Sequence, residues 1–85
     1  MQDHDNKADD TSRMIRSLTE RIERNPSDEE ALIERGRLYW SLNRRSDAIG
    51  DYLAAQKLNP EGKATQLLKA TYDILDFYNK DLYNP

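Results

Sequence analysis

The 85-residue sequence contains no cysteine, which excludes both a disulfide framework and a thiolate metal site. Glycine and proline occur only three times each, and no glycine-rich phosphate loop is present. No apolar run approaches the roughly 18 residues of a membrane span, and no alternating β-branched run predicts a strand. The sequence therefore predicts an all-α protein that does not enter a membrane.

The excess of one sign of charge over the other is also small: the formal net charge is only -3, and the pI is about 5.1. Nucleic-acid binding requires a basic face, so we expect no nucleic-acid partner. The N-terminus lacks the basic-then-apolar order of a secretory signal. We therefore expect a cytoplasmic protein.

The excess negative charge lies in residues 1–10, which contain four aspartates and one lysine. Only Met1 and Ala8 are apolar there, so the segment has too little apolar surface to offset the entropy of ordering. We predict a disordered acidic tail over residues 1–10. Residues 11–85 are then expected to form a single helical domain.

The first predicted helix starts from a cap at Asp10 or Thr11 and runs to about Arg24. Its apolar residues follow a helical spacing of three and four: Met14, Ile15, Leu18 and Ile22. Asn25-Pro26 ends it, because proline pushes the preceding residue out of the helical region.

Ser27 and Glu30 form a predicted capping box ahead of the second helix, which is expected over residues 28–42. A polar turn at residues 43–45 follows, and Ser46 or Asp47 is the expected cap of the third helix. The buried side of the third helix is expected to contain Ala48, Ile49, Tyr52, Leu53, Ala55 and Leu58.

The third helix is predicted to end at Asn59-Pro60, and a fourth to run from Glu61 or Lys63 to Asn79. Apolar residues cover more than one face of this last helix, which predicts two packing neighbours. Its aromatic residues are expected in the core and end-cap: Tyr72, Phe77, Tyr78 and Tyr83. Residues 81–85 are expected to dock back on the domain.

The two Asn-Pro pairs lie 34 residues apart, and each closes an apolar-periodic helix. A 34-residue period with a helix-turn-helix between the breaks is typical of tetratricopeptide repeats (TPR). Seven residues between the breaks carry the resemblance: Leu32, Gly36, Tyr39, Ala48, Tyr52, Ala55 and Pro60. The segment 29–62 thus resembles one complete repeat, with Arg35 as a departure where the family usually buries leucine.

The resemblance implies a TPR-like antiparallel array of about four helices. Gly36 and Ala48 are small so that the two central helices can approach closely. Residues 14–26 resemble the second half of a preceding repeat. Ala70 lies 34 residues after Gly36, so the last helix resembles the first half of an unfinished repeat.

In this family, the first helix of each repeat lines a concave groove that binds peptides. The resemblance assigns this role to Glu30, Ile33, Arg37, Trp40 and Ser41, on the side of the helix opposite Leu32, Gly36 and Tyr39. Tryptophan and arginine are enriched among residues that dominate binding energy. The alternative is that the terminal helices simply cover Trp40 and Ile33.

The sequence offers no parts for catalysis. His4 is the only histidine and has no partner at metal-ligand spacing. The acidic cluster Asp3, Asp5, Asp9 and Asp10 lacks the calcium-loop pattern. No nucleophile elbow or supported nucleophile is present. We therefore expect no enzyme activity, no metal and no cofactor.

The leading hypothesis is a protein-protein interaction module, an adaptor or scaffold that binds a peptide or protein partner of unknown identity. The alternative is a structural unit that forms a homodimer or larger assembly through the aromatic C-terminal helix. In that case a charge at Ile74 or Phe77 is expected to restore a monomer.

Overall fold

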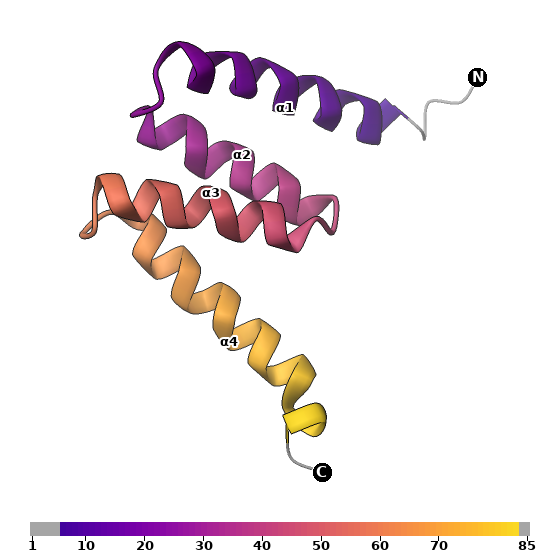
Figure 1. Cartoon of the computed structure of the whole chain (residues 1–85). Coiled ribbons are helices and arrows are strands. Elements are labelled where there is room, and N and C mark those ends of the chain that lie inside the picture. Colours follow the sequence, from indigo (N-terminus) through magenta and orange to yellow (C-terminus); the bar gives the residue numbers. More distant parts are fainter. Residues whose placement is uncertain (1–5, 84–85) are drawn as a thin grey trace.

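Four helices follow one another along the chain in the computed structural model, which describes residues 6–83 and the side chains of residues 8–77. They are α1 (Asn6–Arg24), α2 (Glu29–Ser41), α3 (Arg45–Leu58) and α4 (Lys63–Tyr83). Each helix packs on the next, α1 on α2, α2 on α3 and α3 on α4 (Figure 1). The protein is an all-α domain of four sequentially packed helices.

Helix α1 begins at Asn6, earlier than the predicted cap at Asp10 or Thr11, so residues 6–10 of the predicted disordered tail are helical. Asp9 lies in the first turn, where a negative charge interacts favourably with the helix dipole. Asp10 and Arg13 form an ion pair one turn apart. Residues 1–5 lie outside the described part of the chain. The helix ends at Arg24, before Asn25-Pro26, as predicted.

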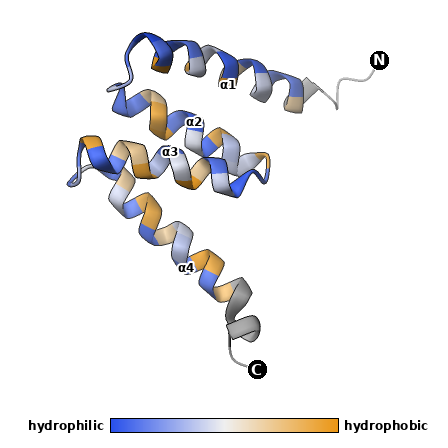
Figure 2. Ribbon diagram, viewed as in Figure 1, coloured by the Kyte–Doolittle hydropathy of each residue, from blue (hydrophilic) through white to orange (hydrophobic). Residues whose placement is uncertain are grey.

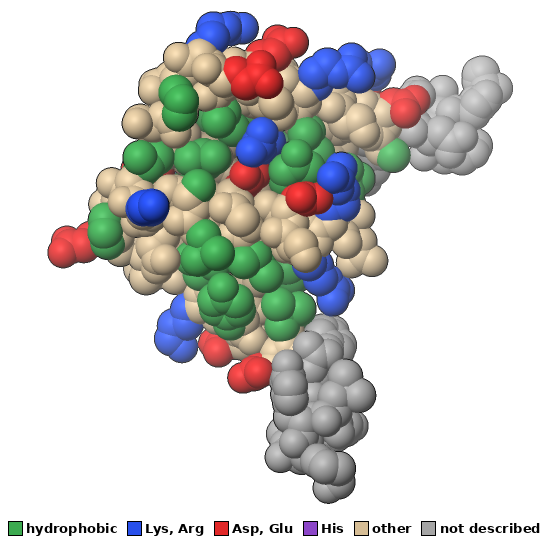
Figure 3. Space-filling view, in the orientation of Figure 1, with side chains coloured by type: hydrophobic (Ala, Val, Ile, Leu, Met, Phe, Trp, Pro, Cys, Tyr) green, Lys and Arg blue, Asp and Glu red, His purple; other side chains and the backbone are tan. Residues whose placement is uncertain are grey.

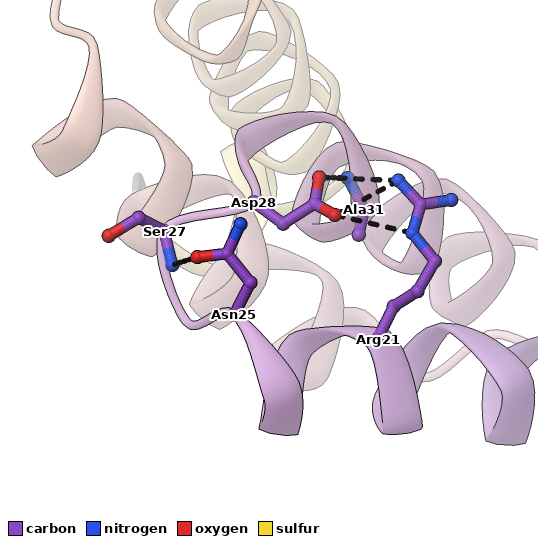
Figure 4. A network of polar contacts seen from close by, with 5 residues as sticks. All are labelled: Arg21, Asn25, Ser27, Asp28 and Ala31. Carbon is purple, nitrogen blue, oxygen red and sulfur yellow. Dashed lines mark hydrogen bonds and ion pairs between the residues drawn. The ribbon is translucent and has the colours of Figure 1, made fainter.

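The cap of α2 is Asp28, and the predicted capping box at Ser27 is wrong (Figure 4). Asp28 Oδ1 accepts the backbone N–H of Ala31 at 3.0 Å, and its carboxylate also meets the Arg21 guanidinium at 3.1–3.2 Å. The Ser27 N–H instead donates to the Asn25 side chain at 3.2 Å. The Ala31 hydrogen bond first, and then Arg21, lower the pKa of Asp28.

The turn between α2 and α3 depends on Asn43, whose φ of 66° is left-handed. The backbone N–H groups of Asn43 and Arg44 donate to the Trp40 and Tyr39 carbonyls, both at 2.9 Å, which closes α2. Helix α3 then begins at Arg45. Ser46 and Asp47 therefore lie inside the helix, and the prediction that one of them caps it is wrong. Asp47 accepts from the Arg44 side chain at 2.9 Å.

Helices α2 and α3 approach each other closely at Gly36. A Cβ atom placed there would lie 2.6 Å from Tyr52 Cε1 and 3.3 Å from the Ala48 carbonyl oxygen. The predicted close approach of two antiparallel helices at small side chains is therefore present. Ala48 and Tyr52 form one buried cluster with Leu68 of α4, against which Tyr39 and Trp40 pack.

A second buried cluster joins α2, α3 and the start of α4. It contains Leu32, Ile33, Ala55 and Ala64, with Ile22 of α1 and Leu67 of α4 packed against it. Residues from all four helices thus meet at this cluster, which gives the flanking helices their hold on the central pair.

Arg35, which departs from the TPR pattern, connects three helices through hydrogen bonds. Its guanidinium donates twice to the Asp51 carboxylate of α3, at 2.8 Å each, and once to Thr19 Oγ1 of α1 at 3.0 Å. The Asp51 side chain is 8% exposed, and its hydrogen bond raises the pKa of Arg35. The pair joins the helices by polar contacts where the family uses leucine.

Helix α4 is longer and less covered than predicted, since it continues to Tyr83 instead of ending at Asn79. Residues 81–83 therefore belong to the helix, while residues 84–85 lie outside the described part. Ala64, Leu68 and Thr71 are buried, but none of the described side chains from residue 72 to residue 77 is. Hydrophobic residues nevertheless continue along α4 (Figure 2).

The first half of α4 has the two predicted neighbours, because Ala64 and Leu68 lie in buried clusters with residues of both α2 and α3. Beyond Thr71, no neighbour buries the described side chains of the helix. Tyr72 and Phe77, two of the aromatic residues expected in the core, are 47% and 70% exposed. The side chains of the other two, Tyr78 and Tyr83, lie outside the described range. The core of the domain ends near Thr71, because only the first half of α4 reaches α3.

Candidate peptide-binding groove

A groove of about 390 Å³ lies between the start of α2 and the turn that leads into α4. Its residues come from α2 and from the segment 59–63, which begins at the second Asn-Pro break. It is lined by Glu29, Glu30, Ile33, Glu34, Arg37, Asn59, Gly62 and Lys63.

The floor of the groove is Ile33, which is only 7% exposed. Ile33 belongs to the cluster with Leu32, Ala55 and Ala64, so packing from α3 and α4 holds it in place. The floor is therefore a fixed apolar surface, which a bound side chain could contact without rearranging the domain.

The α2 wall of the groove carries Glu30, Glu34 and Arg37, which lie four and three residues apart and so share one helix face. All three side chains are exposed. Lys63, at the first turn of α4, lies on the other wall. The groove thus offers charges of both signs beside an apolar floor.

The end of the groove is built around Glu29. Its two carboxylate oxygens accept from Asn59 Nδ2 at 3.3 Å each, which connects the start of α2 to the end of α3. A Cβ atom at Gly62 would lie 2.5 Å from Glu29 Oε2, so the absent side chain leaves room for this contact. Glu29 is therefore structural, and Glu30 and Glu34 are the carboxylates facing solvent.

A second cavity of about 420 Å³ lies between α1 and α2, on the other side of Glu34 and Arg37. Hydrophobic side chains gather in this seam and again over α4 (Figure 3). The cavity is lined by Met14, Ser17, Leu18, Glu34, Arg37 and Leu38. Arg37 and Glu34 therefore border both hollows.

Three of the five predicted binding residues, Glu30, Ile33 and Arg37, line the first groove together. Trp40 does not join them, because it packs against the cluster of Ala48, Tyr52 and Leu68. The Arg45 guanidinium lies 5.2 Å from the centre of its ring, in cation-π contact. Trp40 thus lies toward α3, on the same side as Gly36.

Ser41 lies in a third place, a cavity at the far end of α2 that Ala8, Thr11 and Leu42 also line. Its hydroxyl donates to the Leu38 carbonyl at 2.7 Å, a bond within its own helix. The five residues therefore do not form one surface. The alternative was that the terminal helices cover Trp40 and Ile33. For Ile33 this applies in part, because Ile22 of α1 and Ala64 of α4 pack around it.

The seven residues that carry the family resemblance lie mostly at the contact of α2 with α3. Leu32, Gly36, Ala48, Tyr52 and Ala55 are buried, Tyr39 is half-buried, and Pro60 is exposed in the turn. Arg44 and Arg35 approach the Tyr39 ring at 4.9 and 5.5 Å from its centroid. These residues build the helix pair that carries the groove.

Five residues of the groove were not predicted: Glu29, Glu34, Asn59, Gly62 and Lys63. Glu34 could have been found, because it lies four residues after Glu30 and three before Arg37 on the same helix face. Glu29 likewise lies on α2, four residues before Ile33. Asn59, Gly62 and Lys63 meet the groove only through tertiary packing, and their sequence positions carry no signal for it.

Among the side chains of residues 8–77, no three histidine, aspartate or glutamate side chains gather around a common point. His4, Asp3 and Asp5 lie outside that range. Over the same residues, no helix combines the length and the apolarity that crossing a membrane requires.

The fold and the groove define the class to which the chain belongs: an all-α domain of four sequentially packed helices with a solvent-open groove. Comparison of the chain with models of protein families, with curated proteins and with solved structures finds no match.

Proposed function

We propose that this protein is a TPR-like protein-protein interaction module that binds a peptide segment of a partner in the groove between α2 and the start of α4. The single observation that carries the proposal is the convergence of Glu30, Ile33 and Arg37 on one hollow with Lys63 opposite them. The chain acts as an adaptor, and the groove binds without transforming its ligand.

The chemistry of the groove suits a peptide. An apolar floor at Ile33 accepts an aliphatic side chain, and exposed charges at Glu30, Arg37 and Lys63 can pair with charged side chains or with backbone amides. Arginine provides a planar set of donors that recognises carboxylates in two-point contacts. Specificity would come from where these charges lie along the peptide.

The family resemblance supports the same proposal. The contact of Gly36 with Tyr52 is what the 34-residue pattern requires of a helix pair, and the groove lies on α2, the first helix of that pair. Arg35 differs from the family pattern, but its bonds to Asp51 and Thr19 satisfy its charge away from the groove.

The test is selection of peptides from a random displayed library against the whole chain. We expect a consensus sequence to be enriched, and synthetic peptides of that consensus to bind in a calorimetric titration. Arg37→Ala and Glu30→Ala are each expected to weaken binding about tenfold or more, as for residues that dominate an interface.

Arg24→Ala is the matched control, because Arg24 is an exposed arginine outside the groove, paired only weakly with Glu20 at 4.0 Å. It should leave the affinity unchanged. Absence of any enriched peptide, or equal affinity for the wild-type chain and both groove variants, would contradict the proposal.

A further inference from the structure

The chain contains two helices that match the halves of its own central pair. The two Asn-Pro breaks are 34 residues apart, and α1 and α3 end directly before them, at Arg24 and Leu58. The same interval separates the beginnings of α2 and α4, at Glu29 and Lys63. Thus α1 is equivalent to α3, and α4 is equivalent to α2.

Helix α2 packs on α3, but neither α4 nor α1 has the equivalent partner among the described residues. Within residues 6–83, no α3-type helix follows α4 and no α2-type helix precedes α1 (Figure 1). Within this part of the chain, each flanking helix therefore lacks the partner that its equivalent has in the α2–α3 contact.

The open face of α1 can be assigned by residue. Subtracting the interval from Ala48, Asp51 and Tyr52, which are the α3 residues that face α2, gives Met14, Ser17 and Leu18. All three line the cavity of about 420 Å³ between α1 and α2. Met14 is 48% exposed, whereas Leu18 is 7% exposed and lies at the bottom of this face. The cavity thus lies where an α2-type helix would pack on α1.

The open face of α4 follows in the same way. Gly36, Tyr39 and Trp40, which face α3 from α2, correspond to Ala70, Asp73 and Ile74 of α4. All three of these α4 residues are exposed, and Ile74 is 42% exposed. Ala70 and Ile74 form a continuous apolar strip, because residues four apart lie on one face of a helix.

We propose that α4 of one copy packs against α1 of a second copy in the way that α2 packs against α3, so that two chains complete a repeat between them. The second copy's α1 supplies the missing α3-type helix. The exposed α4 then fills the cavity bordered by Met14 and Leu18. The assembly runs head to tail.

The sizes of the side chains fit this arrangement. In the central pair, Gly36 lies against Ala48 and the large ring of Tyr52. In the composite pair, Ala70 would lie against Met14 and the smaller Leu18. A larger side chain at one α1 position is offset by a smaller one at the other, and methionine adapts to irregular spaces.

The charges fit as well. Asp73 and Arg13 are equivalent to Tyr39 and Asp47, and in the central pair both of those residues contact Arg44. Asp73 of one copy and Arg13 of the next would therefore come near each other with opposite charges. Their present partners, Lys69 and Asp10, are neighbours on their own helices and remain exposed.

This interface is heterologous, because two different surfaces meet, and it generates chains or closed rings of copies. An isologous contact of α4 with α4 of the partner would give a dimer only. The two arrangements differ in whether α1 takes part. None of the six interface positions lines the peptide groove, although Glu34 and Arg37 border both hollows. Variants at Met14 and Ile74 therefore test assembly without altering a groove residue.

The test uses two variants, each blocking one face: Met14→Lys on α1 and Ile74→Lys on α4. Both positions are well exposed, so both variants should keep the helicity and cooperative unfolding of the wild type by circular dichroism. Masses are measured by light scattering after size exclusion over a range of concentrations. Leu53→Lys, at a residue of α3 that is 45% exposed, is the matched control.

We expect the mass of the wild type and of Leu53→Lys to rise with concentration beyond that of two chains, or to reach a fixed ring size. Each blocked variant alone should be a monomer. An equimolar mixture of the two should form a complex of two chains, because it contains one intact α4 face and one intact α1 face.

A wild type that stays monomeric at every concentration would overturn the proposal. So would a Met14→Lys variant that still dimerises, or a mixture that stays monomeric, since both results indicate an α4–α4 contact or none. Loss of assembly in Leu53→Lys would show that an added charge disrupts assembly even away from α1 and α4. That result would also overturn the proposal that the faces at Met14 and Ile74 form the interface.

Discussion

At the scale of single residues, a close contact between the two central helices is made by a residue without a side chain. Gly36 lies in the middle of α2, where glycine lowers helix stability by about 1 kcal/mol relative to alanine. The Tyr52 ring occupies the space that a methyl group would need. Tight packing between α2 and α3 therefore outweighs helix propensity at this position.

The two helical glycines provide a matched test. Gly36→Ala should lower the free energy of unfolding by about 1–3 kcal/mol, because the methyl group forces Tyr52 and the Ala48 backbone apart. Gly50→Ala should instead raise it by about 0.5–1 kcal/mol, since no heavy atom of the described chain lies within 4 Å of that Cβ position beyond its own helix backbone and sequence neighbours. Urea unfolding followed by circular dichroism measures both changes in the free energy of unfolding. Equal changes in the two variants would contradict the close contact of Gly36 with Tyr52.

The pair of Arg35 and Asp51 is the other decisive contact at this scale. Asp51→Ala should cost about 3 kcal/mol, because it leaves the largely buried guanidinium without its carboxylate. Arg35→Leu combined with Asp51→Leu should cost much less, since no charge is then left unpaired. A double-mutant cycle from denaturant unfolding gives the coupling. Additive losses would indicate that the two side chains act independently.

At the scale of the helix, the start of α2 depends on Asp28 and not on Ser27. Asp28→Ala removes both the cap on the Ala31 N–H and the ion pair with Arg21, so it should lower the thermal midpoint. Asp28→Asn should keep most of the cap and lose only the pair. Ser27→Ala should leave the midpoint unchanged. The reverse order of effects would restore serine as the cap.

The contribution of Asp28 also depends on pH with a defined sign. The pKa of Asp28 in the folded protein lies below its unfolded value of about 3.9, so its stabilising effect is complete above about pH 4. The effect is lost as the pH falls through the folded pKa. The difference between the wild type and Asp28→Ala should therefore narrow in acid. A difference independent of pH would show that the carboxylate charge is not involved.

The ends of helices could be predicted where a single local effect decides them. The Asn-Pro pairs placed the ends of α1 and α3 at Arg24 and Leu58, because proline acts on the residue before it whatever the tertiary context. The starts were less predictable. Ser27 and Asp28 can both cap a helix. Arg21, in the last turn of α1, favours Asp28 because it forms a hydrogen bond with the Asp28 carboxylate.

At the scale of the whole molecule, the groove could be predicted only in part. Glu30, Ile33 and Arg37 follow from the helical period, but Trp40 lies only about 40° around the helix from Gly36, so it shares the α3 side. Asn59, Gly62 and Lys63 enter the groove from another element. Their place depends on how α4 leaves the second Asn-Pro break, which no local pattern specifies.

The sequence pattern likewise could not predict that α4 is only partly covered by the rest of the domain. Apolar residues at Tyr72, Ile74 and Phe77 indicate a buried helix whether the covering partner is in the same chain or in another. The structure places the end of the core at Thr71. The described side chains from Tyr72 to Phe77 therefore remain uncovered within the chain, and Ile74 among them belongs to the proposed assembly surface.

The pairing of α2 with α3 supports both the groove and the proposed assembly, so the most direct measurement is of that contact in solution. Nuclear Overhauser spectra of the assigned chain should show strong cross peaks between the Hα protons of Gly36 and the ring protons of Tyr52, because a Cβ atom added at Gly36 would lie only 2.6 Å from Tyr52 Cε1. With both residues assigned and both helices intact by chemical shift, the absence of these cross peaks would contradict the antiparallel pair.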